Sequence, residues 1–229
     1  MSVAGEQAEP LGRVARKRIR RINEILRVAA EVLSEKGYAG TNLEEVADRV
    51  DLAKASLYHY FDSKEALFSA CLGTPAEELI SRLAAITDGG GSPRERLRQL
   101  VVEQVRFTTY DDAELSRLFL QHLDWPESIN AKLHDWRLRH DAIFKQVIEE
   151  GVATGDFVLR DATVARQCLI GALTSVPFWG YKTDGRYTTD ELVEVVADSV
   201  LPLFAPPRSG ADAMRRRRPE ATPPQKSKR

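Results

Sequence analysis

Residues 54–64 hold the densest group of side chains able to contact a polyanion. Tyr58 and Tyr60 carry hydroxyls that can donate to phosphate oxygens. Lys64 opens a predicted helix, where its ammonium and the free backbone amides together favour a phosphate. Thr41 can make the same kind of contact at the start of an earlier helix. Contacts of this type position a protein on a nucleic acid without reading its sequence.

Four residues beside these tyrosines have the chemistry to contact base edges in a major groove. Lys54 can donate to guanine O6 and N7, Ser56 can bond several edges, and Ala55 can contact a thymine methyl. His59 has three interpretations: a base contact, a phosphate contact or an ordinary surface histidine. One short helix would present both the phosphate contacts and the base contacts.

Charge is distributed unevenly along the 229 residues, whose formal net charge is −1. Residues 13–70 carry a net +2, residues 71–204 a net −7 and residues 205–229 a net +6. The basic excess is greatest in the run RVARKRIRR near the N-terminus, whose Arg16 and Arg20 we expect beside phosphates. The alternative is a solvated helix face along which arginine side chains lie. The acidic middle of the chain argues against nucleic acid wrapping the whole surface.

The composition is that of a folded globular protein, with 43% hydrophobic and 29% charged residues. Cys71 and Cys168 are too few for a disulfide scaffold and lack the spacing of a metal motif, which favours small buried side chains in a reducing compartment. No apolar stretch approaches the ~20 residues that span a bilayer, and the N-terminus has no signal-peptide core. We therefore expect a cytoplasmic protein with no membrane contact, cofactor or metal.

Catalytic motifs are not found in the sequence. It contains no GxSxG, P-loop or GxGxxG segment. His134 and His140 are six residues apart and so lie on different faces of a helix, unlike the four-residue spacing of a zinc-binding helix. An enzyme is therefore the least favoured class.

Apolar residues recur at helical spacing throughout the chain, and no strand-like alternation persists. The pattern predicts an all-α fold of about nine helices. Gly37 should end the first helix, whose apolar face runs from Ile19 to Leu33, and the residues 73–75 should break the fourth. The later predicted helices cover 54–60, 64–72, 75–87, 93–110, 112–125, 127–150, 161–179 and 189–204.

Capping signals support several of these helix starts. A side-chain oxygen just before a helix accepts from a free backbone amide, and a Glu three residues later completes a capping box. The signals are Ser63, Ser92 with Glu95, Thr188 with Glu191, and either Thr41 with Glu44 or Asn42 with Glu45.

Two short helices joined by a tight turn at 50–53, with a first helix packed across them, would place a recognition helix in a major groove. Spacing alone does not separate this arrangement from a structural helical hairpin. The residue content does: GYAGT at 37–41, LAKASLYHYF at 52–61 and SKEAL at 63–67 closely resemble the TetR (tetracycline-repressor-like) family of bacterial transcription regulators. The sequence departs from the family pattern at Ala53, where a capping Ser is common, and at Ala55, where Gly is common.

The resemblance implies a three-helix, helix-turn-helix DNA-binding domain followed by a larger helical ligand-binding and dimerisation domain. Helices at 161–181 and 189–204 would pair with their symmetry mates, so that a homodimer meets a palindromic double-stranded operator. An ordinary monomeric core is the alternative for those apolar stripes. The predicted division is a disordered arm at 1–12, the DNA-binding domain at 13–72, the second domain at 73–205 and a disordered basic tail at 206–229.

The resemblance also implies a ligand pocket among the helices at 93–110, 112–124 and 127–150. A few polar groups there would orient a mostly apolar ligand. Core packing is the alternative for each aromatic residue. The expected ligand-binding residues are Val101, Gln104, Val105, Arg106, Phe119, His122, Leu123, Trp125, Trp136, His140 and Phe144.

The segment from Gly155 to Trp179 looks similar to regulators of fatty-acid or sterol catabolism that respond to acyl-CoA thioesters. The CoA phosphates would need cationic partners, for which Arg94, Arg96, Arg98 or Arg106 are available. A regulator of efflux or secondary metabolism that responds to a hydrophobic drug is the alternative.

Taken with the residues above, the resemblance implies a ligand-responsive, DNA-binding transcriptional repressor that its effector releases from the operator. The alternative from a different class is a helical protein-interaction module that does not bind DNA.

Overall fold

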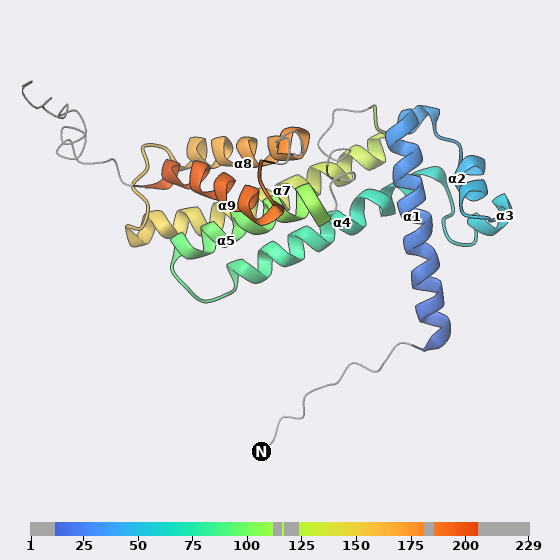
Figure 1. Ribbon diagram of the computed structural model, residues 1–229, viewed down its shortest axis with the longest axis horizontal. Coiled ribbons are helices and arrows are strands. Elements are labelled where there is room, and N and C mark those ends of the chain that lie inside the picture. The colour runs from blue at the N-terminus through green and yellow to red at the C-terminus, as the bar shows by residue number, and fades with distance from the viewer. Residues whose placement is uncertain (1–11, 112–115, 117–123, 181–185, 206–229) are drawn as a thin grey trace, which may run out of the picture.

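The computed structural model describes residues 12–111, 116, 124–180 and 186–205, and all regular structure within these residues is helical. The all-α prediction is therefore confirmed. In Figure 1, α1 (Arg13–Gly40), α2 (Leu43–Arg49) and α3 (Lys54–Leu57) lie together at one end of an elongated molecule. α4 (Lys64–Thr87) begins beside them and runs toward the opposite end.

The opposite end is a bundle formed by the remaining helices, with α5 packed against α4, α7 and α9. Its elements are α5 (Pro93–Arg106), the π-helix η1 (Phe107–Asp111), α7 (Glu127–Thr154), α8 (Ala162–Trp179), α9 (Thr189–Val200) and the 3-10 helix η3 (Leu201–Phe204). The predicted helix at 112–125, the N-terminal arm and the basic tail lie almost wholly outside the described residues. No described helix is long and apolar enough to cross a membrane.

Two buried clusters follow from the apolar periodicity of the helices. In the first, Ile25 of α1, Val46 of α2, Leu57 of α3 and Phe68 of α4 are all inaccessible to solvent or nearly so. The second contains the inward residues of α5, α7, α8 and α9, among them Leu100, Phe144, Leu173 and Val196. α4 contributes to both clusters, because Leu83 from its second half belongs to the bundle core.

α1 is kinked at Gly37, where the sequence predicts its end and φ is +68°, and the helix then continues to Gly40. A side chain at this φ is strained, so glycine is the natural residue here. Asn42 caps α2 by accepting a hydrogen bond from the Glu44 amide at 3.0 Å. Of the two predicted signals for this helix, Asn42 is therefore the cap, and Thr41 lies buried one residue earlier.

The predicted break at residues 73–75 is wrong. α4 continues from Lys64 to Thr87 with Pro75 inside it. Proline removes one backbone hydrogen bond and usually ends or kinks a helix. Here Gly73 and Pro75 are both buried, and the helix has buried cores at both of its ends. Burial of the apolar residues along α4 outweighs the lost bond, and the predicted domain boundary at 72–73 falls inside a continuous helix.

Two further helices are shorter than predicted. α3 ends at Leu57 rather than Tyr60, and its N-cap Ala53 has no side-chain oxygen to accept an amide. α5 ends at Arg106, after which the chain adopts the wider π-helical turn to Asp111. The capping boxes predicted at Ser92 and at Thr188 are both confirmed.

Candidate nucleic-acid interface and internal cavity

The turn between α2 and α3 is held in place by backbone hydrogen bonds and one arginine. The Leu52 amide donates to the Ala47 carbonyl at 2.9 Å. Asp51 adopts a left-handed conformation, with φ of 51°, which Asp tolerates better than most residues. Arg21 of α1 donates from its guanidinium to the Val50 carbonyl at 2.7 Å. α1 therefore helps to hold α2 and α3 in their relative orientation, through the Arg21 hydrogen bond to the turn between them.

One side of α3 and the turn after it faces solvent. Lys54, Ala55 and His59 are exposed, and Tyr58 has 42% of its surface accessible. Leu57 and Phe61, on the opposite side, are buried in the first core, as their spacing predicts. The structure thus brings together the side chains that the sequence assigns to base and phosphate contacts, with Ser56 half-buried beside them.

Two aromatic rings hold cations at the edge of this face. The Lys64 ammonium lies 4.4 Å from the centre of the Tyr38 ring, and the Arg18 guanidinium lies 5.4 Å from that of Tyr60. Partial burial lowers the pKa of Lys64 from its ordinary value. Such contacts favour a defined cation position over a freely rotating one. Lys64 is also in the first turn of α4, where its positive charge adds to that of the free amides.

Lys54 and Thr41 have partners within the protein. The Lys54 ammonium pairs with the Glu44 carboxylate at 2.5 Å, which lowers the pKa of Glu44 and raises that of Lys54. Thr41 is buried, and its hydroxyl donates to the Gly37 carbonyl at 2.7 Å. Thr41 therefore acts as a local brace at the end of α1 in this conformation, whereas Lys54 is exposed and its ion pair is reversible.

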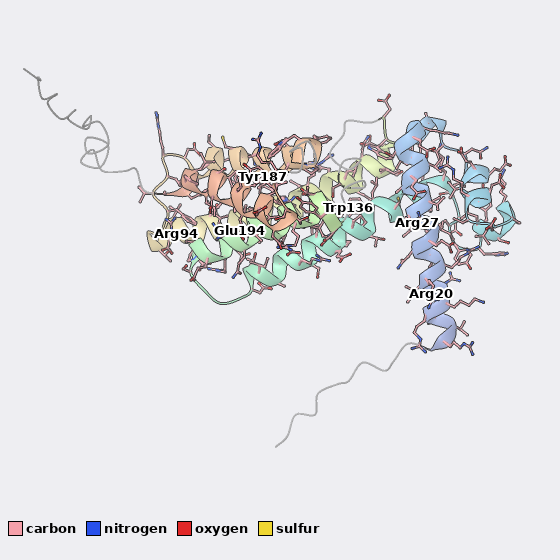
Figure 2. The ribbon with its side chains drawn as sticks, in the orientation of Figure 1. Arg20, Arg27, Arg94, Trp136, Tyr187 and Glu194 are labelled. Carbon is pink, nitrogen blue, oxygen red and sulfur yellow. The ribbon has the colours of Figure 1, made fainter. Side chains whose placement is uncertain are left out.

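The arginines of the predicted basic arm lie on the N-terminal part of α1. Arg16 and Arg20 are both exposed, and Figure 2 shows Arg20 on the stretch of α1 that extends past α2 and α3. The first turn of this helix contains no acidic residue. The N-terminal part of α1 therefore adds exposed positive charge to that of α3 and the start of α4.

The bundle contains a cavity of about 590 Å³ between α4, α5, α7 and α8. Its described walls combine nine apolar residues with nine polar or charged ones. The lining residues are Leu72, Pro75, Ala76, Leu79, Ile80, Gln104, Phe107, Thr108, Ser116, His134, Trp136, Arg137, Leu138, His140, Asp141, Gln167, Ile170 and Thr174.

Only part of the expected lining reaches this cavity. Gln104, Trp136 and His140 line it. The other expected residues that the structure describes do not line it: Val101, Val105 and Phe144 are buried in the bundle core, Trp125 belongs to the first core, and Arg106 pairs with Asp190 of α9 at 2.8 Å. Phe119, His122 and Leu123 lie outside the described residues.

Sequence reasoning missed the α4 and α8 walls of the cavity. Leu72, Pro75 and Leu79 from α4 and Ile170 from α8 all line it. The predicted break at 73–75 placed these α4 residues at a helix end, away from the bundle. The signal that identifies them is the apolar spacing of Leu72, Ala76 and Leu79, which matches one face of a continuous helix.

The arginines suggested as partners for CoA phosphates have other contacts. Arg96 is buried and pairs with Glu150, and Arg98 pairs with Asp198 at 2.8 Å. Arg94 donates to the Asp156 carbonyl at 2.8 Å. None of these side chains lines the cavity, whereas the exposed Arg137 does.

A hydrogen-bonded pair lies inside the cavity. His140 Nε2 is 2.7 Å from Gln104 Oε1, and the His140 ring packs 5.1 Å from that of Phe144. Desolvation lowers the pKa of His140 to about 4, against a smaller opposing effect of Asp141. The imidazole is therefore neutral at physiological pH.

Trp136 connects the cavity with the first core. It lines the cavity and also packs in the cluster that contains α1, α2 and α3, as Ile129 and Leu133 of the same helix do. Its indole Nε1 donates to Glu77 of α4 at 2.8 Å, and Figure 2 shows the residue between the two helices. A Cβ atom on Gly73 of α4 would lie 2.9 Å from the indole, so the helices are in close contact here.

The outer faces of α8 and α9 carry exposed apolar side chains. Val164, Phe178 and Trp179 lie on α8, Val195 lies on α9, and Leu203 follows in η3. Such residues are unremarkable singly; these lie on helices that follow one another along the chain.

Comparison with known proteins agrees with this architecture. Residues 25–71 match the family described as bacterial regulatory proteins, tetR family, and residues 90–204 match the tetracyclin repressor-like C-terminal domain. The repressor KstR2 of Rhodococcus jostii is 27% identical over 82% of this chain and 93% of its own length.

Solved structures give the same result. A TetR/AcrR-family transcriptional regulator from Thermobifida fusca is 34% identical, covers 80% of this chain and 97% of its own, and superposes with a TM-score of 0.64. AibR, solved in complex with isovaleryl coenzyme A and operator DNA, is 24% identical, covers 82% of this chain and 99% of its own, and has a TM-score of 0.69. Two family domains that together span most of the described residues, on a fold with an exposed recognition face and an internal cavity, show that the chain belongs to the TetR family of bacterial transcriptional regulators.

Proposed function

We propose that this protein is a homodimeric repressor that binds a palindromic operator and is released from it by a small, largely apolar effector. The observation that carries the proposal is the position of α4. Leu67 and Phe68 of this helix lie in the core that holds α2 and α3, and Leu72, Pro75 and Leu79 line the cavity one to three turns later. Occupancy of the cavity and placement of the recognition helix would thus be coupled through one continuous helix.

On the operator, Lys54, Ala55, Ser56 and His59 would face base edges in the major groove. Tyr58, Tyr60 and Lys64 would bind phosphates on either side, and Arg16 and Arg20 would add phosphate contacts from α1. The exposure of these side chains on one face supports the assignment. Thr41 would join them only after releasing the Gly37 carbonyl.

The domains would divide as the sequence predicts, with α4 as the shared helix. The exposed apolar faces of α8 and α9 support pairing through the segments 161–181 and 189–204. A two-fold dimer would present its two recognition helices about 34 Å apart, one turn of B-DNA.

We propose an acyl thioester as the effector class to test first. The support is the isovaleryl coenzyme A bound by AibR, which shares this fold, together with the apolar residues in the walls of the cavity. Because the arginines at 94–106 do not line the cavity, the CoA phosphates would lie near Arg137, which does.

The experiment is a mobility shift on the promoter fragment next to the protein's own gene, at ~150 mM salt with excess competitor DNA, because the basic segments bind any DNA at low salt. Wild type should give a discrete complex, and Tyr58→Ala should abolish it. Tyr110→Ala is the matched control, since Tyr110 is similarly exposed but lies in η1. A complex that survives in Tyr58→Ala would contradict the assignment of the recognition face.

The same complex tests release by an effector. Acyl-CoAs of increasing chain length should reduce the bound fraction, and free coenzyme A should not. If neither acyl-CoAs nor apolar drugs change the operator affinity, ligand-controlled repression is the wrong mechanism.

A further inference from the structure

The polar pair inside the cavity can be assigned by its hydrogen-bonding capacity. Gln104 Oε1 is an amide oxygen and cannot donate, so the proton of the 2.7 Å bond belongs to Nε2 of His140. His140 is neutral, so its other nitrogen, Nδ1, is a lone-pair acceptor. The Gln104 amide nitrogen keeps two N–H donors. Among the residues that the structure describes, neither Nδ1 of His140 nor the amide nitrogen of Gln104 has a hydrogen-bond partner.

The position of this pair is fixed from several sides. Only 3% of the surface of Gln104 is accessible, and its backbone carbonyl accepts from the Thr108 hydroxyl at 2.8 Å. The His140 ring packs against Phe144, which is fully buried. The Gln104 amide is therefore held in one orientation in the cavity wall.

The charged side chains that line the cavity lie closer to solvent than Gln104 does. His134, Arg137 and Leu138 line the cavity but are exposed, and Asp141 accepts from Arg166 and Gln167, both at 3.0 Å. Arg137, a cation among the described lining residues, is exposed, although partial desolvation lowers its pKa. A carboxylate placed against the Gln104 amide would be desolvated without a counter-charge, whereas a carbonyl or hydroxyl oxygen can accept from the amide N–H with no charge to desolvate.

We infer that the cavity binds molecules whose buried part is an apolar body bearing one uncharged oxygen, a carbonyl or hydroxyl, that accepts a hydrogen bond from the Gln104 amide N–H, whose orientation is fixed by the bond from His140 Nε2 to Gln104 Oε1. This rests on the proposed function only in taking the cavity as the effector site. The buried part is not a carboxylate, and any charged part of the molecule lies beside the exposed Arg137.

The test compares three matched aromatic compounds by calorimetric titration of the full-length protein. They are heptanophenone, which has a neutral carbonyl, heptylbenzene, which has none, and 4-hexylbenzoate, which is charged. Heptanophenone should bind about tenfold more tightly than either of the others, the ordinary effect of one well-satisfied buried hydrogen bond. Equal affinities, tighter binding of the benzoate, or binding by none of the three would overturn the inference.

Variants locate the effect. Gln104→Leu, which keeps the side-chain size but removes the donor, should bring the ketone and the hydrocarbon to equal affinity. Gln146→Leu makes the same change at an exposed position of α7 that does not line the cavity, and should leave the tenfold preference intact. A preference that persists in a folded Gln104→Leu, or disappears in Gln146→Leu, would overturn the assignment. The comparison in wild type stands even if Gln104→Leu does not fold.

The outcome separates this inference from the proposed function. If heptanophenone binds with the predicted preference but does not change the operator affinity, the neutral-oxygen site is supported and ligand-controlled repression is contradicted. Release of the operator by compounds that bind without the preference would support repression and contradict the neutral-oxygen site.

Discussion

Lys54 is the cation proposed to contact base edges, and in the structure it is paired with Glu44. Binding DNA requires this pair to open, and the freed carboxylate then lies close to phosphates. We predict that Glu44→Gln raises operator affinity several-fold, whereas Lys54→Ala lowers it and decreases the salt dependence by about one released ion. Fluorescence anisotropy over a salt series measures both effects.

The control for this prediction is Glu78→Gln, which removes an equally exposed ion pair with Arg82 on α4, away from the recognition face. It should leave operator affinity unchanged. Weaker binding by Glu44→Gln would show instead that the ion pair positions α3 for DNA.

His140 should make folding stability depend on pH. Burial lowers its pKa to about 4, below the ordinary 6.5, so the unfolded chain binds more protons between these values. Stability from this group is therefore present above pH 6.5 and is lost as the pH falls below it. Between pH 7.5 and pH 5 the free energy of unfolding, measured by urea denaturation, should fall by about 2 kcal/mol because of this group.

His140→Gln should show a smaller loss over the same range than wild type. His134→Gln, at an exposed lining position, should behave as wild type. Identical pH dependence in all three proteins would mean that His140 is solvated in solution.

At the scale of elements, the contact between α4 and α7 depends on the absence of a side chain at Gly73. A Cβ atom there would lie 2.9 Å from the indole of Trp136, which is also held by Glu77. We predict that Gly73→Ala destabilises the protein by about 1 kcal/mol, since overpacking exceeds the gain in helix propensity. Chemical denaturation measures the change.

Trp136→Phe lacks the ring atoms that clash, so the double variant should recover part of the stability that Gly73→Ala loses. Gly171→Ala on α8, where a Cβ atom meets open space, serves as the control and should be neutral or stabilising. Additive effects of the two substitutions would show that the helices separate easily. α4 would then be a poor link between cavity and recognition helix.

For the whole molecule, the exposed apolar residues of α8 and α9 predict self-association. Val195→Glu places a charge in the proposed dimer interface, where it would be desolvated without a partner. Light scattering should give twice the 25.6 kDa chain mass for wild type and the single mass for this variant. Val152→Glu on α7 is the control, because its exposure, 42%, matches the 41% of Val195. A monomeric wild type would exclude the palindromic arrangement.

Much of the fold was predictable because the signals are local. Helical periodicity, the turn at 50–53, the kink of α1 at Gly37 and the caps at Ser92 and Thr188 all depend on residues close in sequence. The recognition face was predictable for the same reason: Lys54, Tyr58 and Lys64 lie within eleven consecutive positions, so a short helix and its neighbour suffice to group them.

Tertiary structure alone decided the cavity and its connection to the recognition helix. Pro75 reads as a helix breaker by local rules, yet burial in two cores keeps α4 continuous and brings Leu72 and Leu79 to the cavity. The Arg106 guanidinium has the chemistry to bind an anionic ligand, yet it forms an ion pair with Asp190, which is far away in the sequence. Partner choice and helix continuity depend on which distant surfaces meet, and that is settled only when the helices pack.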